Sequence, residues 1–251
     1  MNLPKYKIIS KTKKDLFEYY VLIDELDRKL FLKKTISKDI DLVKSQKNEI
    51  QKYQYIVAND KTINIPNIIS YENNYIIYEY IEGIKLTELK GVSLRNLLII
   101  YYKICEQVKK IHKLNLVHGD LKLINILLKG NDIYIIDYGA CSFVGERIYF
   151  GSKIYCSIDQ LTKKPSTFKF DIYALGVILY RFVEKKPPYI EFADTKDLIN
   201  QKEQGFPILK NIHINYINDI NNLIQKMVSG NINLDEVIEE IKRIIIYIGV
   251  D

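Results

Sequence analysis

Cysteine is scarce in this chain of 251 residues, which contains only Cys105, Cys141 and Cys156. Their number is odd, and they lack the close paired spacing of a zinc site. Such sparse, unpaired cysteines fit a reducing compartment. We therefore expect the protein to be cytoplasmic and to hold no structural zinc ion.

Long apolar runs are also lacking. Residues 1–7 contain no apolar core of the secretory type, and no run reaches the roughly 18 residues that a membrane helix needs. The sequence IIIYIGV at 244–250 is apolar but short, so we expect it to pack on the domain or on a partner. The sequence thus predicts no membrane partner.

A strong excess of one charge is absent as well. Lysine and arginine total 37 against 31 acidic residues, which gives a net charge of +6, and the basic residues are scattered among acids. Such charges are typical of solvated faces, so no nucleic-acid partner is expected. The 47% hydrophobic content is enough for a sizeable core.

The first third of the chain alternates between apolar and polar residues, as strands do. We expect strands over residues 17–23, 29–32, 68–70 and 75–80, with a polar turn at 24–28. Apolar residues recur at helical spacing from 37 to 55, and Ser37 can cap this helix. Because Gly83 breaks the pattern, an antiparallel sheet with one helix should form a small lobe over about residues 1–82.

Helical spacing dominates the remainder of the chain. Apolar residues recur at steps of three and four between 93 and 113, which predicts an amphipathic helix. Further helices are expected over residues 170–183, 217–228 and 235–246. Since no repeats or long linkers occur, the sequence predicts one α+β domain over 1–251, with a mostly helical larger lobe from about 83 to 251.

Two polar motifs lie near the middle of the chain, HGDLKLIN at 118–125 and IIDYG at 135–139. In residue type, spacing and order they resemble the catalytic loop (HRDLxxxN) and the metal-binding loop (DFG) of the protein kinase family. Phosphoryl transfer needs such acceptor groups in one place, because its charge is handled by positioning, metal ions and fixed dipoles. The resemblance implies a bilobal kinase fold, ATP and Mg2+ as cofactors, and a protein substrate.

The same resemblance implies a role for each polar residue of the two motifs. Asp120 would be the catalytic base, which accepts or orients the proton of the attacking hydroxyl. Lys122 matches the lysine that the Ser/Thr branch of the family places near the transferring phosphate. Asn125 and Asp137 would hold Mg2+, a hard ion that takes oxygen ligands.

In the small lobe, the family pairs a strand lysine with a helix glutamate and uses the lysine to hold the α- and β-phosphates. Glu49 is the expected glutamate. The sequence LFLK at 30–33 resembles the family's VAIK and nominates Lys33. Strand alternation, however, would place Lys34 on the same apolar face as Leu30 and Leu32. Lys33 is preferred on the motif, and Lys34 stays an alternative.

The sequence EYIEG at 79–83 resembles the inter-lobe hinge of the family. There the backbone hydrogen-bonds adenine, and Glu79 and Ile81 are the residues expected to bind it. Tyr78 would be the gatekeeper before the hinge, and Leu127 the floor under the base. A stacked spine is expected from three rings, those of Tyr53, His118 and Tyr138.

Downstream, GSKIYCSIDQL at 151–161 resembles the end of the kinase activation segment. The family's serine or threonine at the position of Ser152 bonds the catalytic aspartate and lysine. Asp171 matches an aspartate that accepts backbone N–H bonds from the catalytic loop. Asp159 replaces the usual glutamate of APE, and no arginine occurs near Asn231, where the partner of that glutamate is expected.

The chain departs from the family pattern in two further places. No glycine precedes Gly83, so the glycine-rich turn over the nucleotide phosphates is absent, and Lys13 and Lys14 stand there instead. Gly119 replaces an arginine that in many relatives pairs with a phosphorylated activation loop. Control by that ion pair is therefore not expected.

The leading hypothesis is an ATP-dependent Ser/Thr protein kinase with Asp120 as its base. One alternative is a pseudokinase that keeps the fold and regulates a partner, which the missing glycines suggest. Another is a small-molecule phosphotransferase of the aminoglycoside or choline kinase type, because HGD also opens the catalytic loop of those enzymes. The sequence indicates neither the physiological substrate nor the oligomeric state.

Overall fold

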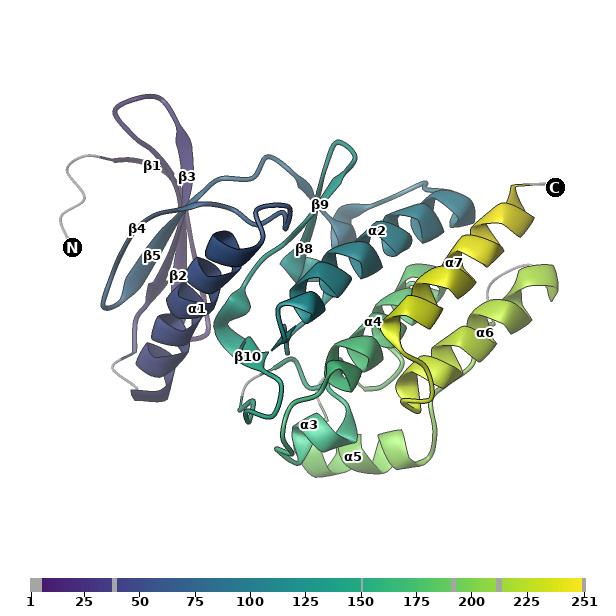
Figure 1. Cartoon of the computed structure of the whole chain (residues 1–251). Coiled ribbons are helices and arrows are strands. Elements are labelled where there is room, and N and C mark those ends of the chain that lie inside the picture. The colour runs from purple at the N-terminus through teal and green to yellow at the C-terminus, as the bar shows by residue number, and fades with distance from the viewer. Residues whose placement is uncertain (1–5, 38–39, 150, 191–192, 211–213, 250–251) are drawn as a thin grey trace.

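The computed structural model describes residues 6–37, 40–149, 151–190, 193–210 and 214–249. Figure 1 shows a small lobe, made of an antiparallel sheet and α1 (Ile40–Asn59), beside a larger lobe made mostly of helices. The expected α+β class and the two-lobed arrangement are confirmed.

The small lobe is built on a sheet with strand order β1-β2-β3-β5-β4. Its strands are β1 (Lys7–Lys14), β2 (Phe17–Ile23), β3 (Lys29–Thr35), β4 (Ile68–Glu72) and β5 (Tyr75–Glu79). Leu22, Leu30 and Leu32 are buried together on one face. On the other face, Phe31 and Ile76 join the main core. Both faces of β3 therefore carry apolar side chains, because one face packs into the small core and the other into the main core.

The bounds of β3 and α1 differ from the expected ones by several residues. Strand β3 continues to Thr35, and α1 runs from Ile40 to Asn59 rather than over 37–55. Ser37 therefore precedes the helix by three residues and does not stand at its N-cap position, while residues 38–39 lie outside the described part. The helix extends four residues further because Ile56 of its last turn is fully buried.

The hairpin of β1 and β2 has a tight turn. Lys14 pairs with Phe17, so only Asp15 and Leu16 form the turn, and Asp15 has φ +53°. All residues of β1 are exposed. The glycine-free sequence thus folds as a short two-residue turn with no wider loop.

The larger lobe begins after a short strand, β6 (Ile84–Lys85), and contains six helices among the described residues. They are α2 (Leu94–Lys113), α3 (Ile158–Leu161), α4 (Phe168–Glu184), α5 (Thr195–Glu203), α6 (Ile214–Val228) and α7 (Leu234–Ile248). Four short strands lie in the middle of the chain: β7 (Leu116–Val117), β8 (Ile126–Lys129), β9 (Asp132–Ile135) and β10 (Ser142–Phe143).

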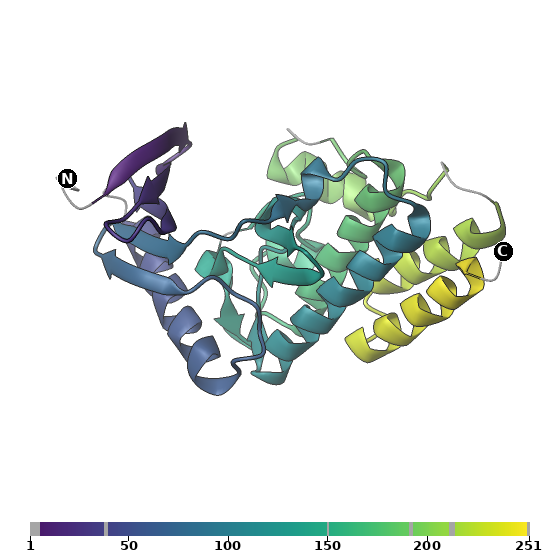
Figure 2. The same ribbon diagram turned by 90° about the horizontal axis from the view of Figure 1, so that it is seen from above.

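Helix α4 is the centre of the larger lobe. Nearly all of its side chains are buried, α2 and α6 pack against it, and α7 packs on α2 and α6. Tyr101 of α2 is fully buried and donates its hydroxyl proton to the Leu175 carbonyl of α4 at 3.1 Å. Figure 2 shows α6 and α7 at the end of the molecule farthest from the small sheet.

The apolar sequence at 244–250 divides between core and surface. Ile244 is buried in the main core, whereas Ile246 and Tyr247 are 65% and 54% exposed. Helix α7 therefore packs one face on the domain, as expected for its amphipathic pattern. Among the described helices, none is long and apolar enough to cross a bilayer.

Candidate active site

A buried carboxylate fixes the loop that carries the HGD motif. Asp171, from α4, accepts hydrogen bonds from the backbone N–H of His118 at 2.8 Å and of Gly119 at 2.9 Å. The ring of His112 lies 2.9 Å from the same carboxylate. Burial alone would raise the pKa of Asp171, but the hydrogen bond with His112, electrostatic attraction by His112 and His118, and the backbone N–H of Gly119 lower it. Asp171 therefore accepts backbone N–H bonds from the loop at 118–125, as the sequence predicted.

Gly119 is required by the geometry of this loop. Its φ is +75°, and a Cβ there would lie 2.8 Å from the carbonyl oxygen of Ala140 and 2.7 Å from Ile148. A backbone oxygen cannot move aside as a flexible side chain can. The glycine at the position of the family's arginine is thus a steric necessity of this chain.

Asp120 is engaged through both carboxylate oxygens. Oδ2 lies 2.6 Å from Nζ of Lys122, and Oδ1 accepts the backbone N–H of Ser152 at 2.7 Å. Lys122 also donates to the Ser152 hydroxyl at 2.8 Å. The structure therefore brings together the aspartate, lysine and serine that the sequence placed in one centre.

Asn125 is tied to the same loop by its amide nitrogen, which donates to the backbone oxygen of Asp120 at 3.0 Å. Its own backbone carbonyl accepts the N–H of Ile136 at 2.9 Å, which brings the residue next to Asp137 into the site. The Asn125 side-chain oxygen has no hydrogen-bond donor within the described residues. It is thus available to a ligand.

Asp137 lies opposite a lysine of the small lobe. Lys33 Nζ is 2.7 Å from Asp137 Oδ1 and 2.8 Å from Glu49 Oε2. Burial alone would raise the pKa of Asp137, but attraction by Lys33 and its hydrogen bond lower that pKa to about 2. For Lys33, burial acts to lower the pKa, and attraction by Asp137 and Glu49 overcomes this and raises it. Asp137 and Lys33 are therefore charged at neutral pH.

Lys34, the alternative nucleotide lysine, does not belong to this cluster. Its Nζ lies 3.7 Å from Glu18, on the face of β3 that also carries Leu30 and Leu32. Strand alternation correctly places Leu30, Leu32 and Lys34 on one face of β3. That face packs on its own small core and lies away from Asp137. Lys33 shares the opposite face with Phe31.

Glu49 is held by a second hydrogen bond that the sequence did not indicate. The hydroxyl of Tyr78, at the gatekeeper position, donates to Glu49 Oε1 at 2.7 Å. Both oxygens of this 2% exposed glutamate are therefore occupied. Burial, and then the charge of Glu49, raise the pKa of Tyr78, so its hydroxyl stays a donor. No local pattern could have shown this pairing, since the two residues lie 29 positions apart in the sequence.

The expected aromatic spine is in contact. The rings of Tyr53 and Tyr138 are 5.8 Å apart and meet edge to face, and the His118 ring lies 4.8 Å from that of Tyr138. His118 is fully buried, and its Nε2 lies 3.3 Å from the Ile136 carbonyl, as suits a structural anchor. The buried hydroxyls of Tyr53 and Tyr138 have no hydrogen-bond partner in the described structure.

Three rings that were not predicted from the sequence line the small sheet beside Lys33. Tyr19 stacks on Phe31 at 5.9 Å and on Phe17 at 6.1 Å. Lys33 Nζ lies 5.3 Å from the centre of the Phe17 ring. The period of two in β2 could have indicated this row, because Phe17 and Tyr19 must share a face.

The hinge residues and Leu127 meet at the junction of the lobes. A Cβ on Gly83 would lie 3.3 Å from the Cβ of Leu127, which is half-buried on β8. Ile81 is buried, and its N–H has no acceptor among the residues that the structure describes. The Glu79 side chain accepts from Asn67 at 2.8 Å, and the Glu79 N–H donates to the Asn67 carbonyl at 2.8 Å.

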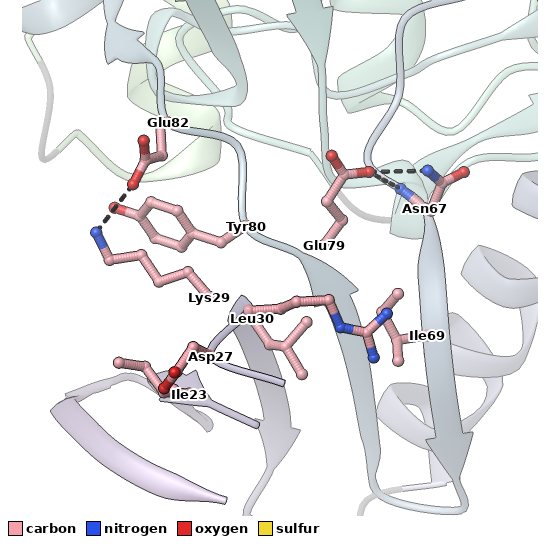
Figure 3. A pocket seen from close by; sticks show the side chains of 10 residues that line it. Ile23, Asp27, Lys29, Leu30, Asn67, Ile69, Glu79, Tyr80 and Glu82 are labelled. Atoms are coloured by element: carbon pink, nitrogen blue, oxygen red, sulfur yellow. Dashed lines mark hydrogen bonds and ion pairs between the residues drawn. The ribbon is translucent and has the colours of Figure 1, made fainter. Parts of the chain in front are cut away.

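A surface hollow of about 690 Å3 lies beside the hinge, on the face of β3 that carries Leu30 (Figure 3). Leu30 and Tyr80 line it, and Lys29 bridges to Glu82 at 3.1 Å across one end. Leu30 and Lys33 are on opposite faces of β3, so this hollow does not adjoin the Asp120 cluster. We therefore assign the hollow no part in the site around Asp120.

The oxygen donors of Asn125 and Asp137 fit a magnesium ion. Both are hard ligands, the carboxylate is ionised, and 35% of the Asp137 side chain is exposed. Magnesium is usually held by one or two carboxylates together with phosphate oxygens and water. A cluster of three or more His, Cys, Asp or Glu side chains, which other metals prefer, is not found in the described ranges.

The model of the protein kinase domain matches residues 18–240. The chain therefore belongs to the protein kinase family. Its structure resembles that of the Cydia pomonella granulovirus kinase PK-1, with a TM-score of 0.75 over 95% of this chain and 94% of that chain. The two sequences are 18% identical, so this likeness shows the shared fold.

Several relatives are serine/threonine-protein kinases. Polo of Drosophila melanogaster is 28% identical over 75% of this chain, and pakA of Dictyostelium discoideum is 27% identical over 61%. Serine/threonine-protein kinase 1 of a Lymantria dispar nuclear polyhedrosis virus is 31% identical over 48%. The matched regions cover 35%, 14% and 46% of those three proteins, so the chain spans less than half of each.

Proposed function

We propose that this protein is an ATP- and magnesium-dependent kinase that phosphorylates serine or threonine hydroxyls of proteins. The observation that carries the proposal is the triad of Asp120, Lys122 and Ser152, joined at 2.6, 2.7 and 2.8 Å. Because Ser152 belongs to the segment that follows the metal-binding loop, the triad couples the catalytic loop to a surface suited to a peptide.

In this function Asp120 orients the substrate hydroxyl and accepts its proton as the oxygen attacks the γ-phosphate. Lys122 offsets the charge that develops on the phosphoryl oxygens. Lys33, held by Glu49, contacts the α- and β-phosphates. Asn125 and Asp137 hold Mg2+, which neutralises charge on the phosphate chain.

The adenine would lie between the hinge and the two lobes. The N–H of Ile81 and the backbone of Glu79 hydrogen-bond its edge, and Leu127 packs beneath it. The rings of Tyr19 and Phe31 cover the site from the small sheet and offer stacking area where glycine backbone is lacking. Lys13 and Lys14, at the exposed end of β1, contribute side-chain charge toward the phosphates.

A transfer assay with radiolabelled ATP and Mg2+ tests this proposal. Wild-type protein should label a generic protein substrate or itself on serine or threonine, and Asp120→Asn should lower that rate by about 100-fold or more. Asp132→Asn, an exposed acid on β9, serves as the matched control and should retain full activity. Equal labelling by wild type and Asp120→Asn would contradict the proposal.

A scaffold without catalytic activity is the second candidate, favoured by the two-residue turn at Asp15 and Leu16. Binding of ATP in the presence of Mg2+ should raise the melting temperature of an active kinase. No shift at millimolar nucleotide, with or without the metal, would favour the scaffold. Turnover of a small alcohol or aminoglycoside without protein labelling would instead favour a small-molecule phosphotransferase.

We also propose that the protein acts in the cytoplasm. All three cysteines are free and buried, which is compatible with a reducing compartment. Fractionation of cells that express a tagged full-length protein would test this location.

A further inference from the structure

Lys202 is a buried lysine with no carboxylate partner in the described part of the chain. It lies on α5, its relative exposure is 7%, and no Asp or Glu of the described residues is within ion-pair distance of its ammonium. Nζ instead donates to the Tyr173 hydroxyl at 2.9 Å and to the Ile154 carbonyl at 3.0 Å. The Tyr189 ring covers it at 4.3 Å from its centre.

A lone buried ammonium is costly, because it loses water without gaining an opposite charge. Burial lowers the pKa of Lys202 to about 7. The charged or titratable groups that face it are Tyr173 of α4, Tyr189 of the following loop and Cys156 of the activation segment. Burial raises the pKa of each of these, that of Cys156 to about 12. In this cluster, Lys202 is therefore the group that changes charge near neutral pH.

The carbonyl that Lys202 binds belongs to a tight turn of the activation segment. Within it the N–H of Tyr155 donates to the Ser152 carbonyl at 2.8 Å, and the N–H of Cys156 donates to the Lys153 carbonyl at 3.2 Å. The same Ser152 contacts Asp120 through its N–H at 2.7 Å. Lys202 thus anchors one side of a turn whose other side meets the catalytic aspartate.

Asp159, at the position of the family's glutamate, does not anchor this turn from within. It pairs with Lys164 at 2.6 Å, and both side chains are more than half exposed. A second contact with the turn comes from the helical core, where Arg181 Nη1 donates to the Tyr155 hydroxyl at 2.9 Å. The side chains of Lys202 and Arg181 therefore both donate hydrogen bonds to residues of this turn.

We propose that Lys202 is a positioning residue of the kinase reaction, whose ammonium form holds the turn at 152–156 against the catalytic loop. The role rests on the kinase activity proposed above. A charged donor binds a carbonyl more strongly than a neutral amine does, and only the ammonium is attracted to the Tyr189 ring. Loss of the proton therefore loosens the turn and lowers activity.

The same proton has the opposite effect on stability. The unfolded chain keeps Lys202 protonated to about pH 10.4, whereas the folded chain releases the proton near pH 7. Between these values the unfolded state binds more protons, so the stability that Lys202 contributes rises with pH. Activity and stability should thus change in opposite directions as Lys202 is deprotonated, which a simple packing role would not produce.

The test compares the full chain with Lys202→Met, which keeps the length of the side chain, and with Lys196→Met as control. Lys196 is exposed on the same helix. At pH 6.5, kcat/KM for dephosphorylated casein should fall about ten-fold in Lys202→Met. The ratio of wild type to Lys202→Met should approach one by pH 9, while Lys196→Met follows wild type throughout. A ratio that does not change with pH would overturn the proposal.

Two measurements do not depend on activity. Amide exchange in the peptide covering 152–156 should be faster in Lys202→Met than in wild type at pH 6.5. The melting temperature of wild type, relative to Lys202→Met, should rise between pH 7 and 9. Unchanged exchange overturns the positioning role. If exchange and melting behave as expected while wild type labels no substrate, the kinase activity fails and the contact between Lys202 and the turn stands.

Discussion

At the scale of single residues, the centre depends on one lysine between two carboxylates. Lys33 neutralises Glu49 of the small lobe and Asp137 of the large lobe at the same time. Since the cluster is partly shielded from water, removing the Lys33 cation leaves both carboxyl groups without their shared ion-pair partner. The position of the helix that bears Glu49 is thus coupled to the charge of Asp137.

This coupling distinguishes the two neighbouring lysines of β3. Lys33→Met should lower the rate of phosphoryl transfer by about 100-fold, because a fixed cation at the phosphates is lost. Lys34→Met should retain activity and melting temperature close to wild type, since Lys34 lies at 3.7 Å from Glu18 on the far face. Labelled-ATP transfer and thermal melts measure both. Greater loss in Lys34→Met than in Lys33→Met would contradict the assignment.

Gly119 and Gly130 form a second matched pair of residues. Both have positive φ, +75° and +59°, but a Cβ at Gly130 would meet no atom within 4 Å. Gly130→Ala should therefore cost about 1 kcal/mol of unfolding free energy from its backbone conformation alone. Gly119→Ala adds the clash with the Ala140 carbonyl and should cost about 2–3 kcal/mol or more.

Urea denaturation of the two variants measures this difference. Gly119→Ala should also lose transfer activity, because Asp120 is the next residue. Equal stability of the two variants would show that the loop around Gly119 has room to relax.

At the scale of elements, α1 is attached to the segment that follows Asp137. Asn48 donates to the Cys141 carbonyl at 2.8 Å, and Ser45 donates to the Gly139 carbonyl at 3.1 Å. These bonds, together with the ion pairs of Lys33, tie the helix firmly to the loop at 137–141. A helix that moves away from the sheet would have to break them together.

Asn48→Ala tests this attachment. The change removes the donor to the Cys141 carbonyl and should cost about 1–2 kcal/mol of stability. It should also lower kcat, because α1 then no longer fixes Glu49 against Lys33. Gln54→Ala on the same helix removes an exposed bond of 3.4 Å to Tyr71 and is the control. Wild-type kcat in Asn48→Ala would exclude a positioning role for this contact.

At the scale of the whole molecule, acid should unfold the protein through carboxylates with depressed pKa values. Asp171 and Asp137 have lower pKa values folded than unfolded, so the stability that they contribute is present above about pH 4. It is lost as the pH falls toward 2. We expect the melting temperature to decrease over this range, and to decrease less steeply in Asp171→Asn.

The neutral-pH behaviour of Asp171→Asn completes this test. An amide offers one oxygen and cannot accept the N–H groups of both His118 and Gly119 as the carboxylate does. Asp171→Asn should therefore be less stable than wild type at pH 7, and the two melting curves should converge at low pH. Parallel curves for the two proteins would show that Asp171 is not a source of the acid sensitivity.

Some elements could be predicted from the sequence because their signals are local. The helix expected at 93–113 is observed as Leu94–Lys113, with the Ser93 hydroxyl accepting from the N–H of Asn96 at its start. Helix α5 was missed, although Asp194 caps it by accepting from the N–H of Asp197, a spacing visible in the sequence. The β8–β9 hairpin was missed too, despite Gly130 and Asn131 in its turn.

The sequence alone determined the family, the two-lobed arrangement and the long helix at 93–113, because periodicity and motif spacing are properties of neighbouring residues. Only the tertiary structure decided between Lys33 and Lys34, since both faces of β3 are apolar and their partners lie up to 104 residues away. It alone placed the Tyr78 hydroxyl on Glu49 and the Lys202 ammonium beneath Ile154. Such contacts join segments that meet only when both lobes have packed, and local patterns cannot encode them.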